Sequence, residues 1–351
     1  MMKVIVVGDI YVAPEIMKEQ AFRLEIKNDI HVVTYNWESR SKKIFRERAH
    51  NIELNGPEAE TIPEMLYKEI EDADMILTHF CPIPERLIKK GKKLKLIGTC
   101  RGGLEHIAVD EATRKGIPVI HCIRNAIPVA DFVLGLIIAE TRNIARSHNN
   151  LMKGEWVKDY PNSSFTTNLE QLKIGILGLG YIGRIAAKKL NALHMEVWGS
   201  DPYVSQEDLN RDGLKIKKVD IESLFANCDV ITLHLRLNEH TKNLVDKKLL
   251  GLMKNTAYLI NTARAGIVKE EDLLESLKKK KIAGAALDVW WEEPIPADSE
   301  FLCLDNVTVT SHIAGDTVDA IPLSPKLLVE EINKYLRTGS NSMVVNLKDI
   351  S

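Results

Sequence analysis

Residues 172–184, Leu-Lys-Ile-Gly-Ile-Leu-Gly-Leu-Gly-Tyr-Ile-Gly-Arg, decide the fold of this chain. A short apolar run ends in Gly-x-Gly-x-x-Gly and continues into apolar residues at the spacing of one helix face. A strand, a tight glycine turn and a helix are how a parallel α/β sheet binds a pyrophosphate. Gly178 allows the tight turn, Gly180 lets the backbone approach the phosphates, and Gly183 lets the helix pack close to the strand. The helix N-terminus then offers unpaired N–H groups to the anion.

A second apolar run, residues 196–200, ends in Asp201. Glycine turns are common, so the first motif alone is weak, but Asp201 follows Gly183 by 18 residues. An acid at roughly that offset meets the ribose hydroxyls of NAD and repels a 2′-phosphate. Asp201 can also be read as a turn acid before Pro202. We predict a dinucleotide site over residues 172–201, with NAD favoured over NADP.

Length and charge limit the classes of partner. The 351 residues suit two domains, and the net charge of −2 is spread over 27% charged residues of mixed sign. A near-neutral charge of this kind gives no electrostatic attraction to nucleic acid or to an anionic membrane. The longest apolar run, residues 132–139, is too short to span a bilayer.

Cysteine usage predicts a cytoplasmic protein without a metal site. The cysteines are scattered, without a Cys-x-x-Cys pair or histidines at zinc spacing. An odd, dispersed set suggests reduced structural thiols, and residues 1–9 are expected to form a strand and a turn rather than a secretory signal. The five are Cys81, Cys100, Cys122, Cys228 and Cys303.

Apolar strands alternate with amphipathic helices along the whole chain, which predicts parallel sheets covered on both faces. Asn125 is expected to cap a helix that runs through residues 132–146 and is buried between domains or subunits. The last helix, residues 325–337, should end at Gly339. The expected strands are residues 4–7, 30–34, 75–78, 94–98, 119–122, 172–177, 196–200, 230–233, 258–260, 285–288 and 307–309.

Two segments are echoed within the chain. Residues 73–79, Ala-Asp-Met-Ile-Leu-Thr-His, resemble residues 228–234, Cys-Asp-Val-Ile-Thr-Leu-His. Residues 99–103 likewise resemble residues 262–266. Buried strands look alike by chance, but the repeated order suggests two related α/β lobes that face one another across a cleft.

Three polar residues follow expected strands and form a coherent chemical set. Hydride transfer between nicotinamide and a carbon that bears oxygen requires a proton to move on that oxygen. His312 suits this task, because the pKa of histidine lies near neutrality, and Glu293 would favour its imidazolium form. Arg264 can clamp a carboxylate through two hydrogen bonds. Singly, they can also be read as a loop histidine, a turn acid before Pro294 and a surface ion-pair partner.

Residues 94–315, which contain these motifs, resemble the NAD-dependent D-2-hydroxyacid dehydrogenase family, which includes D-3-phosphoglycerate dehydrogenases. The resemblance implies that Arg264 binds the substrate carboxylate and carbonyl, that Glu293 pairs with the catalytic His312, and that Asp288 holds the nicotinamide amide. It also implies that the backbone amides of Gly102 and Gly103 hold the carboxylate. No C-terminal regulatory extension of the kind found in some phosphoglycerate dehydrogenases is apparent.

Further contacts are expected around these residues. Arg101 lies beside the carboxylate-binding amides and is expected either to recognise a second anionic group, such as a phosphate, or to be a solvent-facing loop arginine. The cofactor contacts are assigned to Gly178, Gly180, Tyr181, Ile182, Gly183, Asp201, His234, Thr262, Ala263 and Asp288.

We therefore expect two Rossmann-like doubly wound domains. Residues 125–315 would bind NAD, and residues 1–124 with 316–351 would form a flavodoxin-like substrate domain. The expected activity is interconversion of a D-2-hydroxy acid and its 2-oxo acid, in a homodimer joined through the cofactor domain. One alternative is an NADH-sensing binding protein similar to the corepressors built on this fold. The other is formate dehydrogenase, which Glu293 disfavours because that enzyme pairs its histidine with glutamine.

Overall fold

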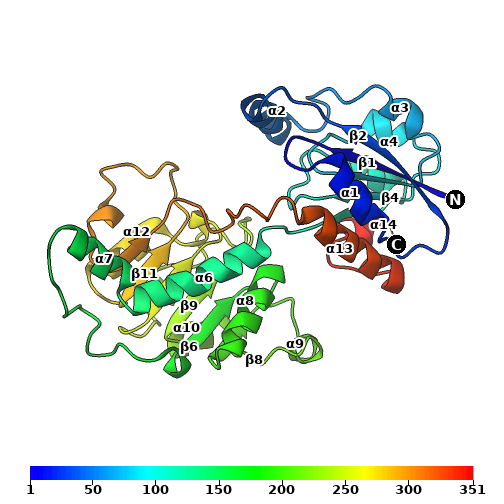
Figure 1. Ribbon diagram of the computed structural model, residues 1–351. Coiled ribbons are helices and arrows are strands. Elements are labelled where there is room, and N and C mark those ends of the chain that lie inside the picture. The colour runs from blue at the N-terminus through cyan, green and yellow to red at the C-terminus, as the bar shows by residue number, and fades with distance from the viewer. Residues whose placement is uncertain (351) are drawn as a thin grey trace. The chain divides into compact units, whose positions relative to one another are not determined.

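The computed structural model describes residues 1–350, which form two compact α/β units (Figure 1). Unit 1 comprises Met1–Arg124 and the C-terminal segment that begins at Thr317, and unit 2 comprises Asn125–Asp316. Each unit has its own parallel sheet and its own hydrophobic core. The expected fold class, two doubly wound parallel-sheet domains, is confirmed.

Unit 1 contains a five-stranded sheet in the order β2-β1-β3-β4-β5, in which every pair is parallel. Its strands are β1 (Met2–Gly8), β2 (Ile30–Asn36), β3 (Met75–Thr78), β4 (Leu96–Thr99) and β5 (Val119–His121). Its helices are α1 (Pro14–Ala21), α2 (Lys42–Asn55), α3 (Leu66–Glu69), α4 (Glu85–Lys90), α5 (Val109–Arg114), α13 (Ser324–Thr338) and α14 (Leu347–Ile350).

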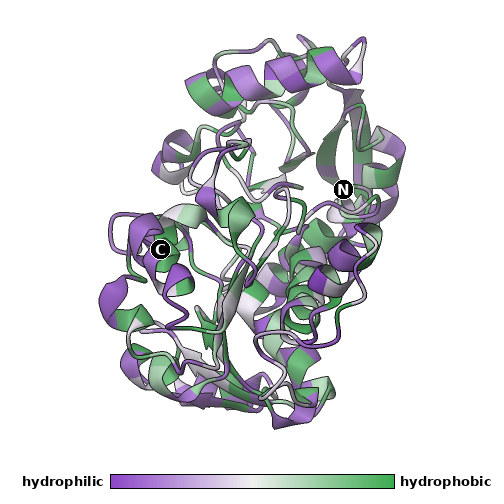
Figure 2. Ribbon diagram, turned by 90° about the vertical axis from the view of Figure 1, so that its left-hand side faces the viewer, coloured by the Kyte–Doolittle hydropathy of each residue, from purple (hydrophilic) through white to green (hydrophobic). Residues whose placement is uncertain are grey.

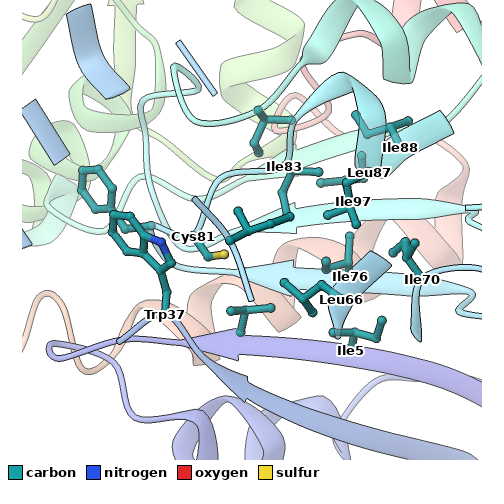
Figure 3. Close-up of a cluster of buried hydrophobic side chains, with 14 of the residues drawn as sticks. Ile5, Trp37, Leu66, Ile70, Ile76, Cys81, Ile83, Leu87, Ile88 and Ile97 are labelled. Carbon is teal, nitrogen blue, oxygen red and sulfur yellow. The ribbon is translucent and has the colours of Figure 1, made fainter. Parts of the chain in front are cut away.

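The core of unit 1 is built from strand residues and from helices that cover one face of the sheet (Figure 3). Ile5, Ile76 and Ile97 from β1, β3 and β4 pack with Leu66 of α3 and Leu87 of α4, and all five are buried. Complete burial of such a side chain contributes roughly 1.5–3 kcal/mol. These short helices depend on tertiary packing, because helices of this length are marginal in isolation.

The C-terminal helix belongs to unit 1, although the 192 residues of unit 2, Asn125–Asp316, lie between the two parts of that unit's sequence. The helix α13 lies beside α1 (Figure 1). Asn333 of α13 accepts from the N–H of Glu25 and donates to the carbonyl of Arg23, just beyond α1. A Cβ atom on Gly98 of β4 would lie 3.3 Å from Ile332. The glycine therefore lets α13 pack closely on the sheet, and the helix ends at Gly339, which has a φ of 68° as expected for a glycine stop.

Unit 2 contains a seven-stranded parallel sheet in the order β12-β11-β10-β9-β6-β7-β8. The strands are β6 (Lys173–Leu177), β7 (Glu196–Ser200), β8 (Ile216–Lys218), β9 (Val230–Leu233), β10 (Tyr258–Asn261), β11 (Gly284–Leu287) and β12 (Val307–Val309). The α-helices are α6 (Ala126–Thr141), α7 (Ile144–Met152), α8 (Tyr181–Ala192), α9 (Gln206–Arg211), α10 (Ile221–Asn227), α11 (Lys247–Leu250) and α12 (Glu270–Lys278). Short 3-10 helices are η1 (Leu169–Gln171), η2 (Ala265–Ile267) and η3 (Glu300–Cys303).

The echoed segments occupy equivalent places in the two sheets. β3 lies within residues 73–79 and β9 lies within residues 228–234, which are the first pair of similar segments. β3 pairs with β1, the first strand of unit 1, and β9 pairs with β6, the first strand of unit 2. In both units the second strand pairs with the opposite edge of that first strand. The strand order therefore reverses direction between β1 and β3 in unit 1, and between β6 and β9 in unit 2. Such switch points are where open α/β sheets bind ligands.

Both faces of the unit 2 sheet are covered by helices, and the helical ribbons of the molecule carry both hydrophilic and hydrophobic residues (Figure 2). One cluster joins the sheet to α10, α11 and α12, and another joins it to α6 and α8. The basic run Lys278–Lys281 at the end of α12 is exposed and pairs with neighbouring acids, as expected for a solvated helix end.

The helix expected to run through residues 132–146 is interrupted, so that prediction was wrong. α6 ends at Thr141, Asn143 adopts a left-handed φ of 57°, and α7 starts anew at Ile144. Asparagine tolerates this conformation better than most residues, and the Asn143 side chain is held by a 2.7 Å hydrogen bond to Asn162. Asn125 precedes α6, but its side chain makes no capping hydrogen bond.

Candidate functional site

The carboxyl edge of the unit 2 sheet gathers the residues that the sequence singled out. Each lies in a loop that directly follows a strand, and parallel strands all end at the same edge. The strand–residue pairs are β6 with Gly178, β7 with Asp201, β9 with His234, β10 with Thr262, β11 with Asp288 and β12 with His312.

The three motif glycines have different surroundings. Gly178 has a φ of 97°, and a Cβ atom there would lie 2.7 Å from the carbonyl oxygen of His234. A Cβ atom on Gly183 would lie 2.1 Å from the carbonyl oxygen of Gly178, so α8 packs directly on the turn. A Cβ atom on Gly180 would meet no atom within 4 Å among the described residues. Gly178 and Gly183 are thus required by the fold, whereas Gly180 leaves room outside the loop.

Asp201 braces this loop as well as its own turn. Its Oδ2 accepts a 2.9 Å hydrogen bond from the N–H of Leu179, and its Oδ1 accepts one of 2.8 Å from the N–H of Tyr203. The turn alternative is therefore present in the structure. Each carboxylate oxygen keeps a second lone pair, so the ribose contact remains a prediction.

The loop after β10 carries a polar atom that fits a ligand. Asn261 accepts from the N–H of Ala263 and donates to the carbonyl of Arg264, which shapes the loop. Between them, the buried Oγ1 of Thr262 has no hydrogen-bond partner within residues 1–350. A buried hydroxyl of this kind requires a partner to offset its desolvation. The unpartnered hydroxyl of Thr262 and the open space beside Gly180 both fit a bound dinucleotide.

His234 supports the glycine turn from the neighbouring strand. Its Nε2 lies 3.1 Å from the Oγ1 of Thr232. Burial lowers the pKa of His234 to about 4, so its imidazole is neutral at physiological pH. Tyr181 and Ile182 are the first two residues of α8, directly beyond the turn.

His312 and Glu293 form the hydrogen-bonded pair that the sequence predicted. The Nδ1 of His312 lies 2.8 Å and 3.0 Å from the two carboxylate oxygens of Glu293, whose Oε1 also accepts from the N–H of Trp290. A carboxylate partner makes Nδ1 the donor, which leaves Nε2 as the nitrogen able to exchange a proton with a ligand. His312 has a φ of 56°, a conformation that is uncommon for residues other than glycine.

Electrostatics within unit 2 keep Glu293 ionised. Burial acts to raise the pKa of Glu293, but the hydrogen bonds from His312 and Trp290 and the positive charge of Arg264 outweigh it, and the pKa is lowered. Arg264 is exposed, and its guanidinium donates only to the carbonyl of Ala263 within the described chain. The remaining N–H groups of Arg264 are thus available for a planar anion.

Asp288 holds the loop that carries His312. Its Oδ1 accepts from the Thr310 hydroxyl at 2.6 Å and from the N–H of Ile313 at 3.0 Å, and its Oδ2 accepts from the N–H of Ala314 at 2.9 Å. Asp288 is completely enclosed, with an exposed fraction of 0%. This geometry supports a positioning role for Asp288, and its expected contact with the nicotinamide amide stays a prediction.

In unit 1, Arg101 is not the solvent-facing arginine that one alternative expected, since it is only 8% exposed. Its guanidinium stacks 3.6 Å above the ring of Phe80, donates to Glu53 at 2.8 Å and lies 3.4 Å from the Nδ1 of His106. These contacts already occupy the guanidinium, so recognition of a second anion by Arg101 stays a prediction.

The two glycines after Arg101 offer backbone donors. The N–H groups of Gly102 and Gly103 make no hydrogen bond within residues 1–350, and the carbonyl of Gly102 lies 2.9 Å from the Nδ1 of His121. Free amides in a turn of this kind are suited to a carboxylate. The Glu105 carboxylate lies close by, 2.5 Å from the position of a Cβ atom on Gly103.

A set of three titratable residues in unit 1, of which Asp9 and His79 are buried, was missed by sequence reasoning. Asp9 follows β1, His79 follows β3, and Arg124 lies three residues after β5. His79 bridges the other two, with Nδ1 2.7 Å from Asp9 and Nε2 2.5 Å from Arg124. The sequence offered one indication of His79, because residues 73–79, which end in His79, resemble residues 228–234, which end in His234. No local pattern links Asp9, His79 and Arg124, because they are far apart in the sequence.

No cluster of three or more histidine, cysteine or acidic side chains placed to hold a metal ion occurs in residues 1–350. In the same part of the chain, no helix is both long enough and apolar enough to cross a membrane.

Comparison with known proteins agrees with this geometry. Residues 134–314 match the model of the D-isomer specific 2-hydroxyacid dehydrogenase, NAD binding domain. A D-3-phosphoglycerate dehydrogenase of Methanocaldococcus jannaschii is 36% identical over 82% of this chain and 54% of its own length. A glyoxylate reductase of Thermofilum pendens is 34% identical over 81% of this chain and 84% of its own. The chain thus spans little more than half of the first of these relatives.

A solved structure shows the same fold at low identity. The D-isomer specific 2-hydroxyacid dehydrogenase of Lactobacillus delbrueckii ssp. bulgaricus, in its NAD-complexed form, superposes with a TM-score of 0.68. The two sequences are 19% identical, and the match covers 98% of this chain and 99% of that one.

Proposed function

The chain belongs to the D-isomer specific 2-hydroxyacid dehydrogenase family, and from this premise we propose that it interconverts a D-2-hydroxy acid and its 2-oxo acid with NAD(H). The observation that carries the proposal is the His312–Glu293 pair on the unit that matches the NAD-binding domain. Arg264 is near enough to this pair for its positive charge to lower the pKa of Glu293. A proton donor, its carboxylate and a carboxylate-binding cation are the groups this reaction requires.

In the direction of reduction, Arg264 holds the substrate carboxylate and polarises the adjacent carbonyl. When bound, NADH supplies the hydride that reduces the carbonyl carbon. His312 donates a proton from Nε2 to the oxygen that becomes the hydroxyl group, while Glu293 stabilises the imidazolium and fixes the ring. Asp288 positions His312 through the hydrogen bonds to its loop. In the opposite direction His312 accepts the proton.

The substrate is part of the proposal as a class only. A phosphoglycerate-like acid is supported by the M. jannaschii relative, and a smaller acid such as glyoxylate by the T. pendens relative. We assign carboxylate binding also to the free amides of Gly102 and Gly103.

The test is oxidation of NADH by the full-length chain in the presence of a panel of 2-oxo acids, with and without a phosphate group. We expect turnover of at least one acid, formation of the D-hydroxy product, and weaker activity with NADPH because Asp201 repels a 2′-phosphate. Binding of NADH without turnover of any acid would instead favour the NADH-sensing alternative. In that case a screen for partner proteins that bind only with NADH would follow.

A homodimer is also part of the proposal, supported by apolar side chains exposed on unit 2. Within the expected segment, residues 132–139, Val133, Leu136 and Ile137 are buried in the core of unit 2 itself. By contrast, α7 contains no buried residue, and Trp156, four residues beyond it, is 78% exposed. The exposed apolar residues of this patch are Ile144, Leu151, Met152, Trp156 and Val157. A concentrated apolar surface of this kind is typical of a protein interface.

Replacing Trp156 tests this interface. We expect Trp156→Glu to shift the wild-type dimer to a monomer in sedimentation velocity, because a buried carboxylate in an apolar contact is unfavourable. Leu54→Glu is the matched control, since Leu54 is 70% exposed but lies on α2 of unit 1. A monomeric wild-type protein, or a dimer unaffected by Trp156→Glu, would refute the assignment.

We also propose a cytoplasmic location, supported by the cysteine usage. All five cysteines are free thiols, and four of them are buried. Burial raises the pKa of Cys81, Cys100, Cys122 and Cys228, so these thiols are unreactive packing residues.

A further inference from the structure

Arg236 is an exposed arginine at the carboxyl edge of the unit 2 sheet, three residues after β9. Its backbone is held in place, because its carbonyl accepts a 2.6 Å hydrogen bond from the hydroxyl of Thr241. Its guanidinium, by contrast, has no acceptor and no acidic partner within residues 1–350. A planar fork of N–H donors on a fixed backbone is suited to an anion.

The segment around Arg236 lies between two loops of the candidate site. On one side, Cδ2 of Leu235 lies 2.9 Å from the position that a Cβ atom would take on Gly178, the first glycine of the turn. On the other side, Cδ2 of Leu237 lies 3.2 Å from the corresponding position on Gly266 of η2. The two leucines therefore fix the backbone of Arg236 beside the glycine turn.

The order of the strands places Arg236 relative to the parts of a dinucleotide. The sheet contains the neighbouring strands β7, β6, β9 and β10 in that order. Asp201 after β7 is assigned to the adenosine ribose, the turn after β6 to the pyrophosphate, and Arg264 after β10 to the acid that meets the nicotinamide. Arg236 follows β9, so it lies on the nicotinamide side of the pyrophosphate. The 2′ position of the adenosine is expected on the other side, beside Asp201.

The pyrophosphate is an anion for which the glycine turn supplies only neutral donors. The N–H groups of Gly180 and Ile182 make no hydrogen bond within residues 1–350, and they lie at the positive end of the α8 dipole. Arg184, in the first turn of α8, is already paired with Asp212. Arg236 adds a full positive charge with unused donors on the β9 side of the turn.

We propose that Arg236 binds the pyrophosphate of the dinucleotide from the β9 side, while the N–H groups of the glycine turn bind it from the α8 side. The guanidinium would donate two hydrogen bonds to phosphate oxygens, as its planar geometry favours. The identity of the ligand rests on the proposed function, which requires NAD(H). The contact itself is measured by binding alone, without any acid present.

Fluorescence titration of the full chain with NADH tests this contact. We expect Arg236→Met to raise the NADH dissociation constant by about tenfold or more, because charged hydrogen bonds to phosphate are lost. Arg236→Lys should bind NADH with an affinity between those of wild type and Arg236→Met, since it keeps the charge but loses the planar fork. Equal NADH affinity of wild type and Arg236→Met would overturn the proposal.

Arg142→Met is the matched control. Arg142 is likewise an exposed arginine of unit 2 without an ion-pair partner in the described chain, but it follows α6 at the opposite edge of the sheet. The nearby Arg146 donates to the carbonyl of Asp305, which precedes β12. We expect both variants to unfold at the wild-type temperature and Arg142→Met to bind NADH like wild type. An equal loss of affinity in both variants would show a general charge effect and overturn the specific contact.

Two further ligands identify the part of the cofactor that Arg236 contacts. ADP-ribose has the pyrophosphate but no nicotinamide, and NADPH carries an additional 2′-phosphate. We expect Arg236→Met to weaken the binding of NADH, ADP-ribose and NADPH by the same factor. A loss confined to NADPH would assign Arg236 to the 2′-phosphate, and a loss that spares ADP-ribose would assign it to the nicotinamide half. Either result would overturn the pyrophosphate assignment.

Kinetics keep this contact separate from the proposed function. With an active 2-oxo acid, Arg236→Met should raise KM for NADH far more than it lowers kcat, because the pyrophosphate does not react. A fall of kcat with an unchanged KM would contradict the contact. If wild type reduces no acid, the proposed function fails, while the titrations with NADH and ADP-ribose still decide the role of Arg236.

Discussion

His312→Ala is expected to lower kcat/KM for reduction of the best 2-oxo acid by about 10²–10⁴-fold, the usual contribution of a positioned proton donor. His312 presents Nε2 to a ligand because its Nδ1 is held 2.8 Å from Glu293. Alanine removes the proton donor and the hydrogen bond to Glu293. The fold should be little affected, since the side chain is 44% exposed. Steady-state kinetics measure the loss of catalysis, and fluorescence titration with NADH measures cofactor binding. NADH affinity should stay within about threefold of wild type.

Two further variants sharpen this prediction. Glu293→Gln removes the charge that stabilises imidazolium and should lower activity by a smaller factor than His312→Ala. Because the pKa of Glu293 is lowered, its carboxylate should stay ionised until the pH falls below the ordinary range of a carboxyl group. In wild type, kcat/KM should fall at low pH as Glu293 takes up a proton, and Glu293→Gln should lack this fall. His31→Ala, at an exposed site on β2, is the control. Activity unchanged in His312→Ala would eliminate the proposed mechanism.

Gly183→Ala is expected to lower both stability and NADH binding, whereas Gly180→Ala is expected to lower NADH binding alone, although both add one methyl group to the same loop. At Gly183 the new Cβ lies 2.1 Å from the carbonyl oxygen of Gly178, so backbone has to move. We expect a loss of about 1–3 kcal/mol in unfolding free energy, the usual cost of overpacking, and NADH binding too weak to measure. At Gly180 the Cβ meets nothing within 4 Å, and stability should change by less than about 1 kcal/mol.

NADH affinity distinguishes the role of Gly180. If the pyrophosphate approaches the backbone there, the added methyl group occupies its place, and the NADH dissociation constant rises by about tenfold or more while the protein stays folded. Urea unfolding and fluorescence titration give the two quantities. A Gly180→Ala variant that binds NADH like wild type would show that the cofactor does not lie against this residue.

Local pattern was sufficient to predict the fold. Strand and helix periods in residues 172–201 identified the first βαβ element of unit 2, and the repeated order of residues 73–79 and 228–234 identified two related lobes. β3, β9 and β12 lie at the predicted residues, because buried parallel strands are continuous apolar runs bounded by polar loops. The interruption between α6 and α7 was missed, because it depends on the bond from Asn143 to Asn162.

The sequence by itself determined the fold class, the dinucleotide turn and the identity of His312 and Glu293, because each is written in a short motif. Only the tertiary structure decided that Arg101 is buried, that Asp288 braces the loop of His312, and that His79 bridges Asp9 and Arg124. These properties arise where strands far apart in sequence end at one edge of a sheet. Asp9 and His79 are 70 residues apart, and only the pairing of β1 with β3 brings them within hydrogen-bonding distance.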